Sequence, residues 1–330
     1  MVKIIAEAGV NHFGNYSLAL KLIDAVKDTG SDFIKFQMID EKELYSPGKY
    51  EYGNYDIEEV RKQRRESHLS TDELNKLFNY AHSIGIPATA TPFGFISLKQ
   101  LIKLNPPFIK IASGDINFYS LIEEAIQTGI KLIISTGMST LKDVEKTVNF
   151  LHSKGCDNFV LMHCISVYPH HESMSQLGYI STLQKEFGCD VGFSDHTLGS
   201  TASCVAIALG VKWIEKHFTL SQKLGGLDAK HSLEPKEFKE FVNLVKAISI
   251  SLEQTDRSLL EEEIFTRKRA RRGLYASRDI LSGETITSND ILYLRPETQI
   301  SIDEFCHLIG KKAKRKINIF SPFIPNDIQS

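Results

Sequence analysis

The stretch "GSDFIKFQ", residues 30 to 37, contains the pattern that determines the fold. Its glycine ends a helical pattern, and a run of β-forming residues that includes Phe33, Ile34 and Phe36 follows two positions later. A glycine just past a helix end is the expected left-handed cap, so the stretch marks a passage from helix to strand. Lys35 lies in the middle of this apolar strand, where burying a charged side chain is costly.

The same passage from helix to strand recurs along the first part of the chain. Five further helical patterns end at Gly85, Gly129, Gly155, Gly188 and Gly210. The β-rich runs that follow these glycines are "IPATAT", "IKLIIST", "NFVLMHC", "DVGFSD" and "VKWIEKHFT". With "KIIAEAG" at the start of the chain and "FIKIASG" after Pro106 and Pro107, the sequence predicts eight strands.

Helical periodicity fills the spaces between these strands. One apolar face follows a capping box from Ser70 to Glu73 and consists of Leu74, Leu77, Phe78 and Ala81. Strands and helices that alternate eight times predict parallel strands with helical crossovers, and the closed form of that arrangement is the (β/α)8 barrel, or TIM barrel. An open doubly wound sheet is the structural alternative, but no GxGxxG follows the first strand, so the sequence does not favour a dinucleotide-binding fold.

The chain divides into a large and a small predicted domain. Residues 1–255 form the predicted catalytic barrel, with "PKEFKEFVNLVKAISISLEQ" as its last helix. Residues 256–272 are charged and aperiodic, which indicates a linker or a bridging helix. Residues 273–330 contain short β runs split by turn residues, which predicts a small β-rich domain. A domain of about 60 residues has a marginal core, so we expect it to pack against the barrel or a partner subunit.

Composition narrows the class of protein. The chain is 42% hydrophobic and 24% charged, with a formal net charge of −2, as expected for a soluble globular protein without a basic nucleic-acid surface. It has no apolar run of about 18 residues and no signal peptide, so we expect a cytoplasmic protein that does not bind a membrane. The five cysteines form no CxxC pair, which indicates reduced thiols and argues against a structural zinc site.

Polar residues gather where the predicted strands end, which is where barrels of this class carry their functional residues. They are Glu7, Lys35, Gln37, Thr91, Lys110, Ser113, Asp115, Ser135, His163, Ser194, His196, Glu215 and His217. The alternation of side chains along a strand places Lys35 and Lys110 opposite their apolar neighbours and inside the barrel mouth. Two converging ammonium groups, with nearby hydroxyls, suit a compact polyanion such as a phosphorylated carboxylate. Each lysine can instead extend to solvent, pair with a carboxylate, or form a Schiff base.

His196 and His217 close successive strands in "FSDHT" and "EKHFT". Because adjacent strands lie about 4.8 Å apart, two imidazoles in equivalent places can share one divalent metal ion in an open, Lewis-acid site. The alternative is that each histidine is a structural hydrogen-bonding residue. Glu7 is a general-base candidate that can equally orient a lysine. The segment of residues 38–69 is longer than ordinary loops in such barrels and is either a lid over the mouth or a solvated excursion.

Several motifs, taken in order, resemble those of the sialic acid synthase family. They are "AEAGVNH", "IKFQ", "TPF", "FIKIASG", "STGM", "HC…YP", "GFSDHT", "IEKHFT" and "LD…HSLEP". That family condenses phosphoenolpyruvate with N-acetylmannosamine or a related 2-acetamido sugar. The segments "RRGLYASRDILSGETI", "YLRPE" and "IGKKAKRKI" resemble the antifreeze-like (SAF) domain that ends those enzymes.

The resemblance implies a role for each matching residue. The expected phosphoenolpyruvate pocket consists of Lys35, Thr91, Lys110, Ser113, Ser135, Ser166 and Ser194, and the expected ligands of Mn²⁺ or Mg²⁺ are His196 and His217. The catalytic residues implied are Glu7, Lys35, Lys110 and Glu215. The sugar side is expected to consist of Gln37, Asp115, Tyr168, Asp228 and Arg295. Ser166 and Asp115 stand where the family carries asparagine and glutamate, so they bear on the choice of sugar.

The resemblance also implies a reaction and an assembly. C3 of phosphoenolpyruvate attacks the aldehyde of the open-chain sugar, water adds at C2, and phosphate leaves, which yields a nonulosonic acid such as N-acetylneuraminic, legionaminic or pseudaminic acid. Arg295 matches an arginine that one subunit inserts into its partner's barrel, which implies a domain-swapped homodimer. Two alternatives remain open, a Schiff-base aldolase of the pyruvate type and a non-catalytic sugar-binding homologue.

Overall fold

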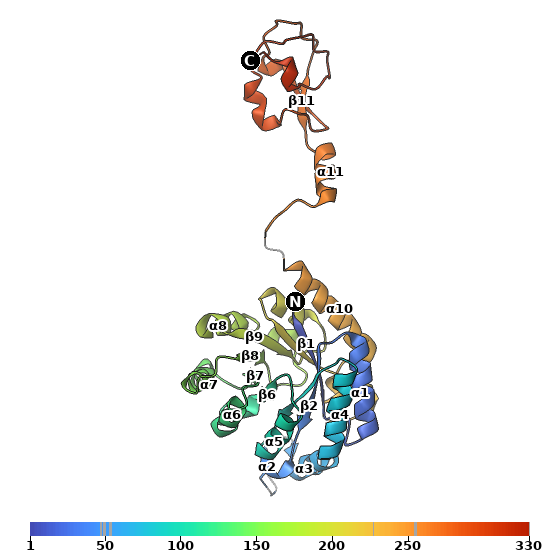
Figure 1. Cartoon of the computed structure of the whole chain (residues 1–330), viewed down its shortest axis with the longest axis vertical. Coiled ribbons are helices and arrows are strands. Elements are labelled where there is room, and N and C mark those ends of the chain that lie inside the picture. The colour runs from blue at the N-terminus through green and yellow to red at the C-terminus, as the bar shows by residue number, and fades with distance from the viewer. Residues whose placement is uncertain (47, 49–50, 53–54, 227, 254–255, 330) are drawn as a thin grey trace. The chain divides into compact units, whose positions relative to one another are not determined.

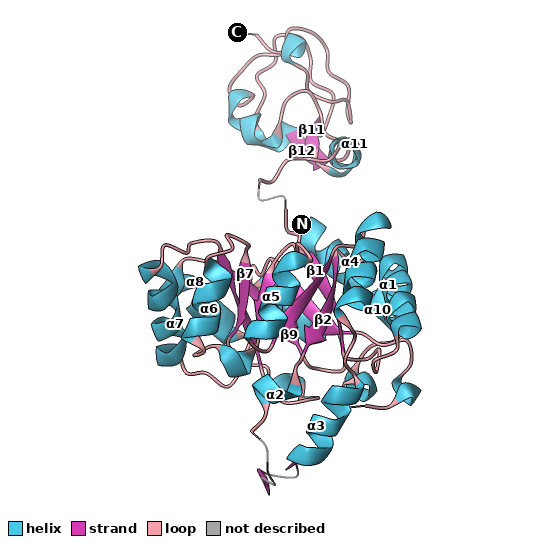
Figure 2. Ribbon diagram, turned by 60° about the horizontal axis from the view of Figure 1, so that its bottom comes forward, coloured by secondary structure: helices cyan, strands magenta, loops and turns pink. Residues whose placement is uncertain are grey.

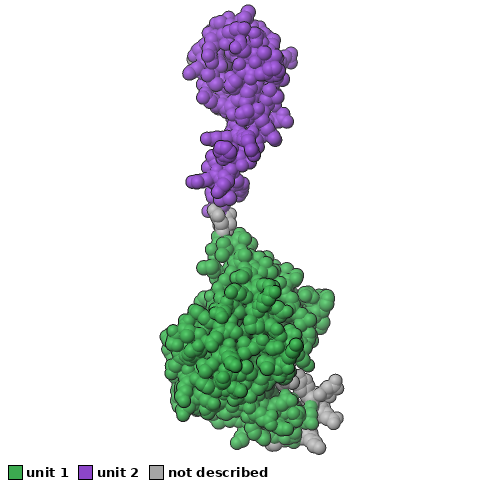
Figure 3. Space-filling view, turned by 90° about the vertical axis from the view of Figure 1, so that its right-hand side faces the viewer, with its two compact units in different colours: residues 1–254 green, residues 255–330 purple. Residues whose placement is uncertain are grey.

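The computed structural model describes residues 1–46, 48, 51–52, 55–226, 228–253 and 256–329. The chain forms two compact units, Met1–Gln254 and Thr255–Ser330, which Figure 3 colours separately. The predicted end of the barrel at residue 255 and the predicted end of the small domain at residue 330 lie outside the described residues. The predicted linker, residues 256–272, contains helix α11 (Glu261–Ala270), which belongs to the second unit.

The first unit is a barrel of parallel strands, and each strand lies on a run predicted from the sequence (Figure 2). The strands are β1 (Lys3–Gly9), β2 (Phe33–Met38), β5 (Ala88–Pro92), β6 (Ile109–Ile111), β7 (Leu132–Ser135), β8 (Phe159–Cys164), β9 (Asp190–Asp195) and β10 (Trp213–His217). Their order is β5-β2-β1-β10-β9-β8-β7-β6, and the hydroxyl of Thr89 donates to the carbonyl of Phe108 where β5 faces β6. The predicted fold class is confirmed, with the barrel nearly closed.

Helices follow the strands and surround the sheet (Figure 1). They are α1 (Tyr16–Thr29), α4 (Thr71–Ser83), α5 (Phe95–Lys103), α6 (Tyr119–Ile126), α7 (Leu141–Ser153), α8 (Gly178–Phe187), α9 (Thr201–Ala208) and α10 (Pro235–Ser251). Helix α4 begins with the predicted capping box of Ser70 and Glu73. Helix α1 ends at Gly30 with φ of 80°, the left-handed conformation that stops a helix and turns the chain into β2. Figure 1 shows α10, the last helix of the unit, beside α1, the first.

Apolar side chains fill the barrel interior on the side away from the carboxyl ends of the strands. Trp213 stacks on Phe33 with ring centroids 5.7 Å apart and meets Phe108 edge to face at 5.5 Å. Gly192 on the neighbouring strand makes room for this packing, because a Cβ there would lie 2.8 Å from the Cβ of Trp213. The interior below the strand ends is therefore a packed core, and any ligand must bind above it.

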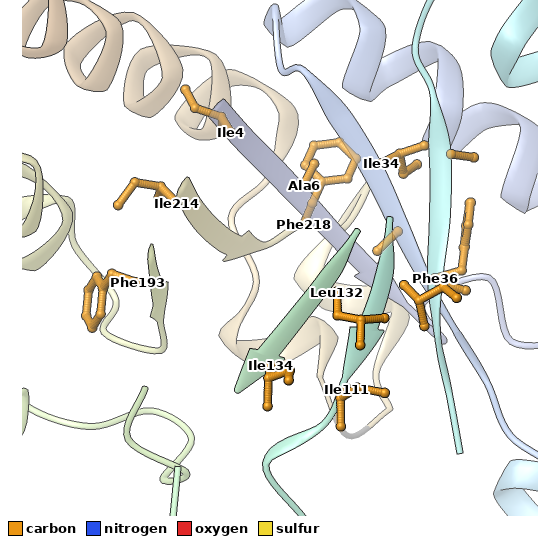
Figure 4. Packing of buried hydrophobic residues seen from close by; sticks show 14 of the residues in the cluster. Ile4, Ala6, Ile34, Phe36, Ile111, Leu132, Ile134, Phe193, Ile214 and Phe218 are labelled. Atoms are coloured by element: carbon orange, nitrogen blue, oxygen red, sulfur yellow. The ribbon is translucent and has the colours of Figure 1, made fainter. Parts of the chain in front are cut away.

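The outward face of the strands packs against the helices. Figure 4 shows this layer, and its labelled residues are Ile4, Ala6, Ile34, Phe36, Ile111, Leu132, Ile134, Phe193, Ile214 and Phe218. Each is at most 1% exposed. These residues alternate along the strands with the inward-facing polar residues, so the same period that builds the core also aims the candidate site residues into the barrel.

A long excursion separates β2 from α4 and corresponds to the segment 38–69. It contains α2 (Glu41–Leu44), β3 (Glu51–Tyr52), β4 (Tyr55–Asp56) and α3 (Ile57–Glu66). The two helices are tied together where Arg65 Nε donates to Glu41 Oε1 at 3.0 Å. Parts of the predicted lid, residues 47, 49–50 and 53–54, lie outside the described residues.

The second unit is small and has its own core. Strand β11 (Gly273–Ala276) pairs antiparallel with β12 (Ile291–Leu294). Ten residues form the core cluster: Leu274, Ala276, Ile280, Ile286, Ile291, Ile300, Leu308, Ala313, Ile317 and Phe323. Single-turn 3₁₀ helices connect the short extended segments, for example Ser288–Asp290 and Pro325–Asp327. The predicted small β domain at the C-terminus is therefore present.

Candidate active site

A pocket of about 480 Å³ opens at the carboxyl ends of the barrel strands. Most of the predicted site residues line it: Glu7, Lys35, Gln37, Thr91, Lys110, Ser113, Ser135, Ser166, Tyr168, Ser194, His196, Glu215, His217 and Asp228. A smaller cavity of about 130 Å³ shares Gln37 and Arg64 with this pocket. The sequence therefore located the pocket and most of its wall.

Lys35 is buried in the barrel and held by two carboxylates. Its Nζ lies 2.6 Å from Glu7 Oε2 and 3.7 Å from Glu215 Oε2, and it donates to Thr91 Oγ1 at 3.1 Å. Burial alone would lower the pKa of the Lys35 ammonium, but the charges of Glu215 and Glu7 outweigh it and the pKa is raised. Lys35 therefore stays charged.

Lys110 also contacts one of these two carboxylates, that of Glu215. Its Nζ lies 3.2 Å from both carboxylate oxygens of Glu215, and Ser194 Oγ donates to Glu215 Oε1 at 3.0 Å. Burial raises the pKa of Glu215, but the ammonium groups of Lys110 and Lys35 outweigh burial and lower it to about 2. Each lysine therefore pairs with a carboxylate and also lines the barrel mouth, so these two interpretations of the sequence are compatible.

The charges at the centre of the site cancel. Lys35 and Lys110 face Glu7 and Glu215, two cations against two anions. The pocket wall also contains Arg64, Lys230 and Asp228, for which no ion pair is found among the described residues. Asp228 Oδ2 is buried and has no hydrogen-bond partner in the described part of the chain.

His196 and His217 approach each other with ring centroids 5.5 Å apart. His196 Nδ1 lies 2.7 Å from the carbonyl oxygen of Ile165, which can only accept, so Nδ1 carries the proton and Nε2 presents its lone pair. Burial first, and the His217 imidazole second, lower the pKa of His196 to about 3, so the ring is neutral. The Tyr168 ring packs over both, with centroids 4.1 Å from His196 and 5.8 Å from His217.

The donor set of this histidine pair fits a divalent cation. Imidazole nitrogens are ligands that transition metals prefer, and His217 Nδ1 is a buried atom without a hydrogen-bond partner among the described residues. Across those residues, no group of three His, Cys, Asp or Glu side chains is placed to hold a metal. Two imidazoles would leave the other coordination positions to water and substrate.

A hydroxyl-rich wall lies beside Lys110. Ser113 Oγ accepts a hydrogen bond from the backbone N–H of Gly137 at 3.1 Å and lies 3.2 Å from Cys164 Sγ. Ser166 Oγ is buried and has no partner among the described residues. A Cβ at Gly137 would clash with the hydroxyls of Ser113 and Ser166, so glycine is needed for the backbone to approach them.

On another wall of the pocket, the side chains of Asp228, Gln37 and Glu7 lie around Gly9. A Cβ at this residue would lie 3.4 Å from Asp228 Oδ2, 3.4 Å from Gln37 Nε2 and 3.5 Å from Glu7 Oε1. Gln37 Nε2 donates to Glu7 Oε1 at 3.1 Å. Gly9 has φ of 54°, in the left-handed region that favours glycine, so both its conformation and its missing side chain keep this corner open.

Three of the predicted residues do not line the pocket. His163 is buried, and its Nε2 lies 2.8 Å from the carbonyl oxygen of Ser175. Asp115, in the 3₁₀ helix Ser113–Asp115, is not part of the pocket wall, and burial raises the pKa of its carboxyl to about 6. Arg295 belongs to the second unit, where it is exposed.

Sequence reasoning missed two cations of the wall, Arg64 from α3 and Lys230 from the 3₁₀ helix Ala229–His231. Arg64 is one of three arginines in the segment "RKQRR", and no pattern distinguished it from its neighbours Arg61 and Arg65. Lys230 lies inside "LDAKHS", between two residues of a quoted motif, and only that position could have pointed to it.

The barrel and its polar mouth define a (β/α)8 enzyme that acts on small molecules at the carboxyl ends of its strands. The chain belongs to the NeuB family, whose family model matches residues 22–257. The family resemblance drawn from the motifs is thereby confirmed.

Individual relatives place the chain among nonulosonic acid synthases. The N,N'-diacetyllegionaminic acid synthase of Legionella pneumophila is 33% identical over 324 residues, 96% of this chain and 91% of that protein. The pseudaminic acid synthase of Helicobacter pylori is 29% identical over 334 residues, 99% of this chain and 98% of that protein. The crystal structure of the N-acetylneuraminic acid (sialic acid) synthetase of Leptospira borgpetersenii matches with a TM-score of 0.73 and 32% identity, over 81% of this chain and 91% of that chain.

These relatives differ in the acid that they are named for, so the comparisons define the class of reaction and leave the sugar open. No helix in the described part of the chain has the length and apolar character needed to cross a bilayer.

Proposed function

We propose that this chain condenses phosphoenolpyruvate with N-acetylmannosamine or a related 2-acetamido sugar, and releases a nonulosonic acid and inorganic phosphate. The observation that carries the proposal is the pair of buried lysines, Lys35 and Lys110, joined by Glu215 beside the His196–His217 pair at the barrel mouth. The family of nonulosonic acid synthases supports the same reaction class.

Phosphoenolpyruvate binds on the side of Lys110 and the hydroxyl wall. The phosphate and carboxylate interact with the two ammonium groups and accept hydrogen bonds from the hydroxyls of Thr91, Ser113, Ser135 and Ser166. Ser194 lines the same pocket, where its hydroxyl donates to Glu215. The hydroxyl of Ser166 has no partner among the described residues, and Ser113, which accepts from the N–H of Gly137, keeps its own hydroxyl proton to donate. Because Glu7 and Glu215 already pair with the lysines, the phosphate and carboxylate meet no excess positive field, and contacts with both ammonium groups and with the hydroxyl wall hold them together.

In the reaction, C3 of phosphoenolpyruvate forms a bond with the aldehyde carbon while water adds at C2. The tetrahedral intermediate then loses phosphate by cleavage of the C–O bond, which leaves the 2-keto group. A carboxylate with a pKa of about 2, such as Glu215, is a weak base, so its role is to fix the two lysines. Glu7 is the base that accepts a proton from the attacking water, and the aldehyde oxygen takes up one proton to become the new hydroxyl group.

His196 and His217 are the residues that would hold Mn²⁺ or Mg²⁺. When bound there, the cation supplies Lewis-acid polarisation of the sugar aldehyde. His196 Nε2 is aimed for this role by the hydrogen bond between its Nδ1 and the Ile165 carbonyl. The ring of Tyr168 packs against His196 and meets His217 edge to face, so it forms one side of this part of the site.

The sugar binds against Gln37, Tyr168 and Asp228. The unpaired Asp228 Oδ2 accepts a hydrogen bond from a sugar hydroxyl, and the space at Gly9 admits the chain of the sugar. We include in the proposal a homodimer in which Arg295 of one copy completes the sugar side of the other. Arg295 is exposed and forms no ion pair with any described residue, which supports such a role. The second unit is proposed to be an antifreeze-like (SAF) domain.

Release of inorganic phosphate from phosphoenolpyruvate tests the proposal. The protein is assayed with Mn²⁺ against a panel of N-acetylmannosamine and its 6-deoxy-2,4-diacetamido relatives, with and without a chelator. We expect release with one class of sugar and its loss in chelator. No release with any sugar, together with no binding of phosphoenolpyruvate by calorimetry, would contradict the proposal.

The two rival functions have weaker support. A Schiff-base aldolase needs a neutral lysine amine, but the pKa of Lys35 is raised, which keeps the amine protonated. Borohydride in the presence of pyruvate would trap such an intermediate, and we expect no covalent adduct. A non-catalytic sugar-binding protein would not need the network of lysines and carboxylates that fills the mouth.

A further inference from the structure

A second buried ion pair lies directly behind the two histidines, on the outward face of the barrel. Strands β9 and β10 are parallel neighbours, and Lys216 is the register partner of Asp195. Lys216 is 2% exposed and Asp195 is 1% exposed. Asp195 precedes His196 in the chain and Lys216 precedes His217, so each histidine is one residue from a member of the pair.

The pair is fully hydrogen-bonded. Asp195 Oδ1 accepts from the N–H of Thr197 at 2.9 Å and from its hydroxyl at 2.8 Å, and Oδ2 accepts from Ser203 Oγ at 2.6 Å. Lys216 Nζ lies 3.0 Å from Asp195 Oδ2 and donates to the carbonyl oxygens of Thr197 and Gly199. Lys216 therefore ties the loop that follows His196 to the strand that carries His217.

Stability does not explain why these charges are buried. The Lys216 ammonium sits 5.9 Å from the centroid of the Phe241 ring, in the layer between the barrel and α10. A buried ion pair recovers little more than its desolvation cost, and apolar side chains of similar volume commonly replace one without loss of stability. A buried pair does fix the backbone on both sides, because its hydrogen bonds have one satisfied arrangement.

We propose that Lys216 and Asp195 are positioning residues that fix the separation of His196 and His217, and thereby set the affinity of the site for a divalent cation. A metal site tolerates displacements of its ligands of only about 0.5 Å, and the pair acts on the backbone of both ligands at once. The inference rests on the metal site of the proposed function.

The test uses a double variant, Asp195→Asn with Lys216→Met, in the full-length protein. Asparagine retains an acceptor for Thr197, and methionine fills the space of the lysine stem without charge. Binding of Mn²⁺ alone is titrated by the electron paramagnetic resonance signal of the free ion, and folding is followed by thermal unfolding. We expect the dissociation constant for Mn²⁺ to rise by about 10- to 100-fold, as for other outer-shell partners of metal ligands, with little change in the unfolding midpoint.

A control ion pair of the same two residue types lies at the other ends of the same strands, where it is exposed and not buried. Lys212 Nζ lies 2.8 Å from Asp190 Oδ1 where β10 and β9 begin, at the opposite end of the barrel from the histidines. The variant Asp190→Asn with Lys212→Met should bind Mn²⁺ as the unmodified protein does. Equal weakening in both double variants would overturn the inference, as would unchanged affinity in the folded Asp195→Asn, Lys216→Met protein.

A milder variant keeps the test decisive if the double variant fails to fold. Thr197→Val removes one hydrogen bond to Asp195 and keeps the ion pair, and it should weaken Mn²⁺ binding by at least about threefold. Unchanged affinity would then overturn the inference. If the unmodified protein itself binds no Mn²⁺, the proposed metal site fails and the positioning role fails with it. If the unmodified protein binds Mn²⁺ and the variants at Asp195, Lys216 or Thr197 bind it more weakly, both the metal site and the positioning role are supported.

Discussion

Both carboxylate oxygens of Glu215 lie 3.2 Å from the ammonium nitrogen of Lys110. This contact joins the strand that carries the second histidine to the opposite side of the barrel, where β6 begins the hydroxyl wall. The same carboxylate lies 3.7 Å from the ammonium nitrogen of Lys35, so one acid is close to both buried cations.

Replacing Glu215 by glutamine should destabilise the protein and stop the reaction. The change leaves two buried ammonium groups with only one carboxylate, Glu7, and an unpaired buried charge costs about 3 kcal/mol. Urea unfolding at neutral pH measures the loss. Glu123→Gln is the control, because its ion pair with Lys154 is exposed and contributes less than about 1 kcal/mol. Similar losses for the two variants would contradict the role of Glu215.

His217→Ala should abolish phosphate release and the binding of Mn²⁺. The variant removes one of two imidazoles whose ring centroids lie 5.5 Å apart, and a single imidazole holds a divalent cation weakly. The assay is phosphate release with and without chelator. His171→Ala serves as the control, because that histidine is exposed and is not part of the pocket wall. Full activity of His217→Ala in the presence of chelator would show that the reaction does not need a metal ion at this site.

Gly9→Ala should weaken binding of the sugar and leave phosphoenolpyruvate binding unchanged. The new methyl group would enter the corner between Asp228 and Gln37, and the positive φ adds strain of about 1 kcal/mol. Gly129→Ala is matched for the strain, with φ of 70°, but its methyl group would meet no atom within 4 Å. KM values for both substrates decide the outcome. An unchanged sugar KM for Gly9→Ala would place the sugar elsewhere.

Asp115→Asn should stabilise the protein near neutral pH only. Burial raises the pKa of this carboxyl from 3.8 to about 6, so the folded state binds the proton more tightly than the unfolded state. The charged form therefore costs stability above pH 6, and that cost disappears as the pH falls through 6 toward 3.8. Thermal unfolding at the two extremes should show a gain for the variant at neutral pH and none in acid. A gain of equal size at both pH values would exclude burial of the charge as its cause, and exposed Asp157→Asn controls for the loss of charge itself.

The strands and the inward residues were predictable because local rules determine them. β9 spans the predicted run "DVGFSD" from Asp190 to Asp195, and the alternation along it sends Ser194 toward the pocket and Asp195 away from it. Glycines in the left-handed conformation precede six of the eight barrel strands, as at Gly30 before β2.

The pairing of charges was not predictable, because it depends on how the strands are arranged around the barrel and on how far each charged group lies from the barrel mouth. Glu215 and Lys110 are 105 residues apart in the chain, and nothing local in either strand indicates the other. The same applies to Arg64, which reaches the pocket from a helix of the long excursion. Asp115 ends outside the pocket wall because the chain turns into a 3₁₀ helix directly after β6.

The cancellation of charge at the centre of the barrel has a kinetic consequence for turnover. A site with two unpaired lysines would hold a released phosphate dianion strongly, and product departure would then limit the rate. Because Glu7 and Glu215 already neutralise Lys35 and Lys110, the centre of the site has no net charge that would retain free phosphate, which lacks the carboxylate through which phosphoenolpyruvate also binds. Inorganic phosphate should therefore be a poor inhibitor, and each cycle ends with the anion returning freely to water.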